Sequence, residues 1–285
     1  IMIREGTAAK DLDALIPVLK EKNTRKCVFV TDDRHPKDLK VHINDMVRRA
    51  VDAGVDIVKA VQIGSLNTAE YFGLKNQGAI APGYKADMLI MPDLKTFKPE
   101  VVIKDGKIAA ENGKLLQSVE EFEKPSIRSS INVHWIVPKD FEIKGTSKFV
   151  NTIEIIPHQL VTKSSVCEAK FENGLLESNV DEDVLKIIVM ERHRATGNIG
   201  KGFVKGFNLK SGAIASTVAH DSHNMIIIGT NDKDMYTAAV ELVKMQGGKV
   251  VVKDGKVVAK LPLPIAGLIS DQCIEYVLQH CEDLN

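Results

Sequence analysis

The pattern of apolar and polar positions changes along this chain of 285 residues. In the first 75 residues, apolar runs such as residues 27–30 alternate with amphipathic stretches such as residues 37–53. Apolar side chains recur at helical spacing in the second of these, and Gly54 follows it. This alternation is typical of a parallel sheet or barrel, of which we expect two strands here.

The rest of the chain follows other patterns. Residues 78–91 form a Gly/Pro turn leading into a short strand, and residues 101–109 predict a hairpin on the Asp105-Gly106 turn. A charged stretch at about 113–128 predicts a linker. Beyond it we expect strands at 133–137, 152–156, 166–171, 185–190 and 225–229, and helices at 232–245 and 271–280. These elements predict a separate α+β domain.

Composition excludes several classes of protein. Lys plus Arg and Asp plus Glu both number 38, so no global positive field would hold nucleic acid or an anionic membrane. Aromatic residues make up only 5%, which argues against a base-stacking platform. No apolar run approaches the roughly 18 residues of a membrane helix. Cys27, Cys167, Cys273 and Cys281 form no CxxC pair, so we expect free thiols and a cytoplasmic location.

The most informative polar cluster follows the apolar run at residues 27–30. Asp32 and Asp33 are adjacent carboxylates at the end of a buried strand, which is costly unless they meet a cation, a proton or a ligand. Barrels of α/β type place their chemistry at such strand ends. Asp32 is therefore a candidate metal ligand and general base, with Arg34 and His35 near the substrate. Alternatively, this is a strand-to-helix loop in which Asp33 or Asp38 caps the helix.

Two more polar clusters end apolar strands in the second part of the chain. One lies before the strand at 225–229 and consists of His220, Asp221, Ser222, His223 and Asn224. Its imidazoles could contact a ligand, although a polar β-turn is the alternative, because HxxH in a loop implies no fixed metal geometry. In the other, Glu191 and His193 precede glycines that lack the order of a dinucleotide site, so we expect a mobile loop there.

Several motifs together resemble the bacterial adenine deaminases of the amidohydrolase superfamily. These motifs are Ile3-Arg-Glu-Gly-Thr-Ala8, Thr31-Asp-Asp-Arg-His-Pro36, Asn67-Thr-Ala-Glu-Tyr-Phe-Gly73, Gly78-Ala-Ile-Ala-Pro-Gly-Tyr-Lys-Ala-Asp87, Val218-Ala-His-Asp-Ser-His-Asn224 and Leu261-Pro-Leu-Pro-Ile-Ala-Gly-Leu-Ile-Ser-Asp271. The third and fourth occur across many amidohydrolases and indicate only the superfamily. The Asp-Asp-Arg-His-Pro and His-Asp-Ser-His-Asn segments look specific to adenine deaminases.

The resemblance implies an α/β architecture based on the (β/α)8 TIM barrel of a metal-dependent hydrolase. Residues 1–75 would be the C-terminal fragment of the barrel, with strands 7 and 8 and their helices. Residues 76–125 would contribute a segment of a small composite β-sandwich and a linker. Residues 126–285 would be the C-terminal α+β domain typical of adenine deaminases.

The resemblance also implies a reaction, the metal-dependent hydrolysis of adenine to hypoxanthine and ammonia in purine salvage. A strand-8 aspartate binds metal and shuttles the proton in that family, and this role maps onto Asp32, with Asp33 as the fallback if the register is shifted. The cofactor would be a divalent metal, dinuclear manganese or iron, with zinc also considered. The cluster at 220–224 would contact the small-molecule substrate or close over it, with Glu191 and His193 behind.

The chain departs from the family in its metal ligands. Amidohydrolases also use a His-x-His pair, a Glu or carbamylated Lys and two further histidines from earlier strands, and no His-x-His occurs in this sequence. The start, Ile1-Met2-Ile3, reads as a strand entered midway. We therefore expect a truncated chain that is inactive without the N-terminal half of the barrel as partner, and a homo-oligomeric enzyme. Alternatives are an amidohydrolase acting on another cyclic amidine or amide, and a non-catalytic scaffold fragment.

Overall fold

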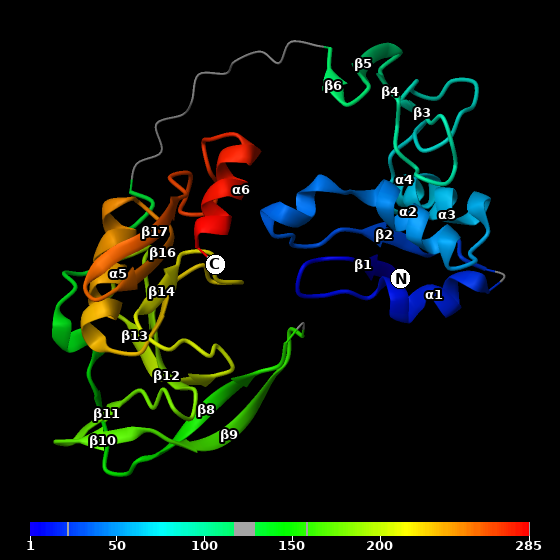
Figure 1. The fold of residues 1–285 in the computed structure, drawn as a ribbon. Coiled ribbons are helices and arrows are strands. Elements are labelled where there is room, and N and C mark those ends of the chain that lie inside the picture. Colours follow the sequence, from blue (N-terminus) through cyan, green and yellow to red (C-terminus); the bar gives the residue numbers. More distant parts are fainter. Residues whose placement is uncertain (22, 117–128, 158, 285) are drawn as a thin grey trace. The chain divides into compact units, whose positions relative to one another are not determined.

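The computed structural model describes residues 1–21, 23–116, 129–157 and 159–284. The chain divides into two compact units, Ile1–Glu123 and Lys124–Asn285, and each is described by itself below (Figure 1). Most of the expected linker, at about 113–128, falls outside the described residues. The secondary structure mixes helices with a larger number of strands, so the overall class is α/β.

The first unit contains a parallel strand pair surrounded by helices. Strand β1 (Met2–Arg4) pairs in parallel with β2 (Val28–Val30), and Ile3 lies opposite Phe29. The helices are α1 (Leu12–Lys20), the 3₁₀ helix η1 (Pro36–Lys40), α2 (Ile43–Asp52), α3 (Ile57–Gly64) and α4 (Leu66–Tyr71). Ile3 and Phe29 pack in one buried cluster with Met46 of α2 and Ile63 of α3. The predicted β-α-β pattern with parallel strands is confirmed.

The prediction of a single amphipathic helix over residues 37–53 is wrong in one respect. The segment consists of η1 and α2, separated by extended backbone at Val41 and His42. Extended backbone cannot continue a helical hydrogen-bond pattern, and the carbonyl of Val41 accepts a hydrogen bond from Arg34 Nη1 at 2.6 Å instead. Apolar periodicity could not show this interruption, because the bond comes from a side chain outside the helix.

The first unit also carries a small antiparallel sheet. Its strands are β3 (Met88–Ile90), β4 (Val101–Lys104), β5 (Lys107–Glu111) and β6 (Lys114–Leu115), in that order. Asp105 and Gly106 join β4 to β5 with φ angles of 48° and 75°. Positive φ at both positions is what a two-residue hairpin of the Asp-Gly type requires, and the predicted hairpin is confirmed.

The second unit is built on an eight-stranded sheet with the order β17-β16-β14-β15-β12-β13-β8-β9. The strands are β8 (Phe149–Ile155), β9 (Thr162–Glu168), β12 (Val184–Met190), β13 (Ile199–Lys205), β14 (Ala213–Ser216), β15 (Met225–Gly229), β16 (Gly248–Lys253) and β17 (Lys256–Pro262). Helix α5 (Asp232–Lys244) packs its Met235 and Leu242 against Ile188, Met190 and Met225 on one face. Neighbouring strands are antiparallel, except that β13 and β8 are parallel.

Smaller elements complete the second unit. They are a three-stranded sheet of β7 (Ile143–Lys144), β10 (Lys170–Glu172) and β11 (Leu175–Glu177), the 3₁₀ helix η2 (Pro138–Phe141) and helix α6 (Ile274–Asp283). The expected strand at 133–137 is wrong, because its backbone groups bond elsewhere. The N–H of Asn132, just before it, donates to Arg192 O, and that of Val137 donates to Asp140 Oδ2.

Candidate functional site

The first candidate site lies at the end of β2. Asp32 is two residues beyond this strand and has a φ of 58°, in the left-handed region. Its Oδ1 accepts the N–H of Asp33 at 2.7 Å, and its Oδ2 lies 3.4 Å from Arg4 Nη1. A Cβ on Gly6 would lie 2.9 Å from Asp33 O, so only glycine allows this close approach.

Arg4 does not fully neutralise Asp32. Arg4 Nε lies 2.9 Å from Asp11 Oδ2, a shorter contact than the one to Asp32. The hydrogen bond with Asp11 is the largest of the causes that raise the pKa of Arg4, and Asp32 contributes less. With one-third of its side chain exposed, Asp32 therefore presents a weakly paired carboxylate at a strand end.

The two residues after Asp33 hold the loop in place. Arg34 Nε donates to Glu5 O at 2.8 Å, while its Nη1 donates to Val41 O at 2.6 Å, so it ties the loop to the residue after β1 and to the segment between η1 and α2. His35 is the N-cap of η1, and its own N–H donates to Thr7 Oγ1 at 2.8 Å. The expectation that Asp33 or Asp38 caps this helix is wrong, because the cap is His35.

The second candidate site consists of two loops at one end of the eight-stranded sheet. Residues 191–198 follow β12 and residues 217–224 precede β15, and Met190 pairs with Met225 across those strands. His193 Nε2 lies 2.9 Å from Ser222 O, and since a carbonyl only accepts, this nitrogen carries the proton. The structure therefore brings together two clusters that lie about 30 residues apart in the chain.

The carboxylate of Glu191 accepts hydrogen bonds from residues of its own loop. Its Oε1 accepts the N–H groups of His193 and Arg194 at 2.5 and 2.8 Å, and its Oε2 accepts N–H and Oγ1–H of Thr196, both at 3.0 Å. These bonds, with that from Thr196 N–H the largest cause, lower the pKa of Glu191 to about 2. The carboxylate thus orders residues 191–196 through these hydrogen bonds to its ionised form.

The cluster at 220–224 forms a turn with specific hydrogen bonds. His223 N–H donates to Ala219 O at 2.6 Å, and His223 Nδ1 accepts Ala219 N–H at 3.3 Å. The rings of His220 and His223 meet edge to face, with centroids 4.8 Å apart. Asn224 Oδ1 is buried without a hydrogen-bond partner among the described residues, whereas Asp221 and Ser222 are exposed.

Arg192, which sequence reasoning did not single out, connects these loops. Its side chain is buried, with 2% of the residue exposed, and burial lowers the pKa of its guanidinium. Nε donates to His223 O at 2.5 Å, Nη1 to Ser130 O at 2.5 Å and Nη2 to Ala266 O at 3.0 Å. The sequence feature that could have pointed to Arg192 is the motif at 261–271, because its Ala266 supplies one of these three carbonyls.

Possible metal ligands among the described residues are the side chains of His, Cys, Asp and Glu. Within residues 1–21, 23–116, 129–157 and 159–284, no group of three or more His, Cys, Asp or Glu side chains could hold an ion. Among the described residues, Asp32 is therefore a carboxylate outside any such group. In the same residues, no helix has the length and apolar character needed to cross a membrane.

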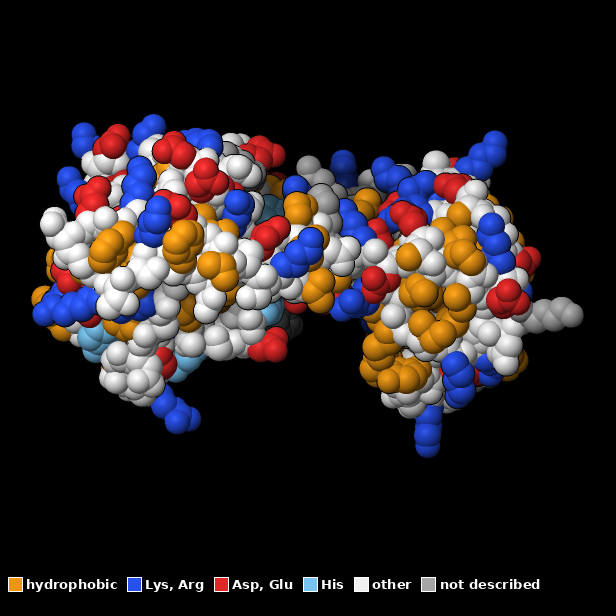
Figure 2. Space-filling view, turned by 90° about the horizontal axis from the view of Figure 1, so that it is seen from below, with side chains coloured by type: hydrophobic (Ala, Val, Ile, Leu, Met, Phe, Trp, Pro, Cys, Tyr) orange, Lys and Arg blue, Asp and Glu red, His pale blue; other side chains and the backbone are white. Residues whose placement is uncertain are grey.

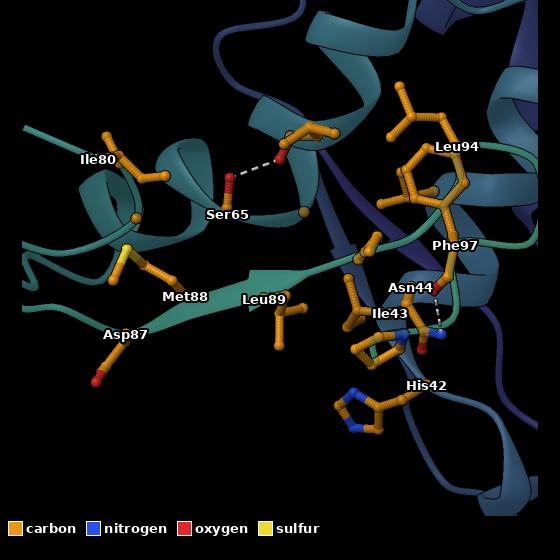
Figure 3. A pocket seen from close by; sticks show the side chains of 17 residues that line it. His42, Ile43, Asn44, Ser65, Ile80, Asp87, Met88, Leu89, Leu94 and Phe97 are labelled. Carbon is orange, nitrogen blue, oxygen red and sulfur yellow. Dashed lines mark hydrogen bonds between the residues drawn. The ribbon is translucent and has the colours of Figure 1, made fainter. Parts of the chain in front are cut away.

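A cavity of about 740 Å³ lies in the first unit and is apolar (Figure 3). Side chains of Ile43, Leu89, Leu94 and Phe97 line it, and Asn44 Nδ2 donates to Phe97 O at 3.0 Å beside them. Asp32 is not among the lining residues, so this cavity is distinct from the candidate site. In the face shown in Figure 2, hydrophobic side chains also gather on this unit, whereas acidic and basic ones are interspersed on both units.

Comparison with known proteins finds a similar family for each unit. Residues 2–109 match the amidohydrolase family, whose members generally use divalent metals, and residues 159–285 match the adenine deaminase C-terminal domain. The first unit is therefore similar to amidohydrolases over residues 2–109.

The chain as a whole is related to adenine deaminases, as the sequence motifs indicated. It is 46% identical to adenine deaminase of Dehalococcoides mccartyi strain 195, 46% to adenine deaminase 2 of Carboxydothermus hydrogenoformans and 47% to adenine deaminase of Desulfatibacillum aliphaticivorans. Each alignment covers 100% of this chain and 50% of the relative. The chain thus spans about half the length of the curated relatives it matches.

Proposed function

We propose that this chain is the C-terminal part of an adenine deaminase, which hydrolyses adenine to hypoxanthine and ammonia in purine salvage. The observation that carries the proposal is the unbroken similarity to proteins named adenine deaminase over both units. Under this proposal, residues 1–75 are the last part of a (β/α)8 barrel, residues 76–125 a sandwich segment and linker, and residues 126–285 the C-terminal domain. A cytoplasmic homo-oligomer completed by the other half of the barrel is part of the same proposal.

Asp32 is the proposed catalytic residue. A divalent metal, manganese or iron in a dinuclear centre or else zinc, would supply Lewis-acid activation of water, with most ligands outside this chain. Asp32 would accept a proton from the attacking water and deliver it to the departing amine, which is a poor leaving group unless protonated. Its weak pairing with Arg4 supports this role, since a carboxylate bound tightly to a guanidinium is a poor proton carrier.

The loops of the second unit are the proposed contacts to the substrate. His193, His220 and His223 present imidazole groups near one another, and Asp221, Ser222 and Asn224 add polar groups to the same turn. Glu191 would act on this surface indirectly, because its carboxylate is used within its own loop. Arg34 and His35 would likewise shape the Asp32 loop, which their hydrogen bonds already order.

The proposal is tested by supplying the missing half. The chain would be co-expressed with the segment of the Dehalococcoides mccartyi relative that it does not cover, and conversion of adenine to hypoxanthine followed by ultraviolet absorbance in the presence of manganese or iron. We expect activity from the pair and none from the chain alone. Activity of the purified chain alone would contradict the proposal, and turnover of another cyclic amidine but not adenine would favour the alternative substrate.

Matched variants of the completed enzyme test the role of Asp32. Asp32→Asn keeps the side-chain size but removes the basic group, and we expect kcat to fall by about 10²–10⁴-fold. Asp33→Asn, one position along the same loop, should leave kcat within about twofold. The reverse result would place the function at Asp33, and unchanged kcat in both variants would exclude this strand end as the source of the proton carrier.

A further inference from the structure

Arg192 is a buried cation with an unusual set of partners. Its recorded partners within the described residues are three main-chain carbonyls, those of Ser130, His223 and Ala266, rather than a carboxylate. By contrast, the buried Lys186 of the same unit meets two carboxylates, those of Glu177 and Asp232. A guanidinium is a rigid planar fork of five N–H donors, so three carbonyls in three directions fix the segments that carry them.

We call Arg192 with these three carbonyls the Arg192 junction. It joins segments that are far apart in the sequence, and a further bond reinforces it at Gly267. Gly267 has a φ of 71°, and a Cβ there would lie 2.9 Å from Arg192 Nη1, so glycine is required for the contact. Thr217 Oγ1 donates to Gly267 O at 2.5 Å. The loop at 217–224 is thus held at its first residue by Thr217 and near its last by His223.

The junction also sets the direction of the His223 ring. A main-chain N–H can only donate, so the bond from Ala219 N–H makes His223 Nδ1 an acceptor, and the neutral ring carries its proton on Nε2. Within the part of the chain that the structure describes, Nε2 has no hydrogen-bond partner, and the residue is half-buried. Because Arg192 holds His223 O and the turn holds Nδ1, the Nε2–H group is a fixed and unused donor.

We propose that Arg192 is a positioning residue that presents the His223 Nε2–H group as a hydrogen-bond donor to a ring nitrogen of the purine substrate. This rests on the proposed function, in which the loop at 217–224 contacts the substrate. A purine ring offers unprotonated nitrogens as acceptors, and a donor whose direction is already fixed loses little entropy when it binds one. The bond is made in both the ground state and the transition state, so it contributes to KM more than to kcat.

The first measurement uses the wild-type chain of 285 residues labelled with ¹⁵N in its histidine rings. Two-bond ¹⁵N–¹H correlation at neutral pH distinguishes a protonated from an unprotonated ring nitrogen. We expect His223 to give a protonated Nε2 and an unprotonated Nδ1. A ring protonated at Nδ1 would overturn the proposal, and this result does not depend on whether any variant folds.

The second measurement compares Arg192→Lys with Arg194→Lys, the exposed arginine two residues along the same loop. Lysine keeps the charge but cannot reach three carbonyls at once, so we expect the His223 tautomers to average in Arg192→Lys and not in the control. In the completed enzyme, Arg192→Lys should raise KM about tenfold with kcat within twofold, as the loss of one hydrogen bond predicts. Unchanged KM in a folded Arg192→Lys protein would overturn the role of Arg192.

His223→Ala separates this proposal from the one on which it rests. If His223→Ala raises KM while Arg192→Lys does not, the contact with substrate stands and the positioning role of Arg192 is wrong. If neither variant changes KM although adenine is turned over, the substrate contact by this loop is wrong, and the inference about Arg192 falls with it.

Discussion

Lys186 offers the sharpest test of what stabilises the second unit. The side chain is completely buried, and its Nζ lies 2.8 Å from Glu177 Oε2 and 2.7 Å from Asp232 Oδ1. Glu177 lies in β11 and Asp232 begins α5, so one ammonium group joins β12 to the central strand of the three-stranded sheet and to the helix. Asp232→Asn and Glu177→Gln each remove one charge at nearly constant volume.

The expected magnitude follows from burial. Leaving a buried charge without its partner costs about 3–5 kcal/mol. Here each single variant leaves the ammonium one carboxylate, and both carboxylates are partly exposed, so we expect each to lower the free energy of unfolding by about 1–2 kcal/mol. The double variant removes all compensation and should cost about 3–5 kcal/mol, more than the sum of the single changes.

Urea unfolding of the whole chain, followed by far-ultraviolet circular dichroism, measures these differences. The control is Glu168→Gln, which breaks the Lys148–Glu168 pair at the same distance of 2.7 Å but with both side chains about half exposed. That change should cost less than about 0.5 kcal/mol. The reasoning is refuted if the two single variants cost no more than the control, or if the double variant costs no more than either single one.

Three further predictions follow from the two loop sites. Lowering the pH from 4.5 towards 2 should release residues 191–196, because the Glu191 carboxylate, whose pKa is lowered to about 2, stabilises the loop only while it is ionised. The amide chemical shifts of the loop should therefore titrate near pH 2 and not near pH 4.5, and Glu191→Gln should abolish this titration step. Gly267→Ala should lower the free energy of unfolding by more than Gly174→Ala, because Gly174 has a similar positive φ but no atom within 4 Å of the new Cβ. If urea unfolding shows equal losses for the two variants, Gly267 does not pack closely on the Arg192 guanidinium. In the completed enzyme, Gly6→Ala should lower kcat at least about tenfold by displacing Asp32, and unchanged kcat would show that the loop tolerates the shift.

Local patterns were the part of the fold that sequence could predict. The Asp105-Gly106 hairpin, the strand at 225–229 and the helix from Asp232 depend on turn chemistry and on periodicity within a few residues. The expected strand at 133–137 failed because its backbone bonds are made by a side chain and by a distant loop. A run of apolar residues carries no information about such partners.

The residues of the candidate sites likewise divide into those that the sequence could single out and those that it could not. Asp32 could be singled out because a carboxylate after a buried strand is unusual in any fold, although its function is still a prediction. Arg192 could not, because Arg192 and Arg194 are alike in the sequence and differ only in burial. What separates them is a set of carbonyls at residues 130, 223 and 266, and no local rule brings those together.

The parallel pairing of β8 with β13 has a consequence for how the second unit opens. Strands β8 and β9 share seven residue pairs with each other, but β8 is joined to the rest of the sheet through only three pairs with β13. We therefore expect the hairpin of β8 and β9 to detach before β12, β15 and the helix α5, with Val150 leaving its buried cluster with Val184 and Phe203. Since β8 and β13 are also distant in sequence, we expect their ladder to close after the local hairpins in folding. The edge of the sheet would then be a separately exchanging region of the molecule, with amide protons that are released together.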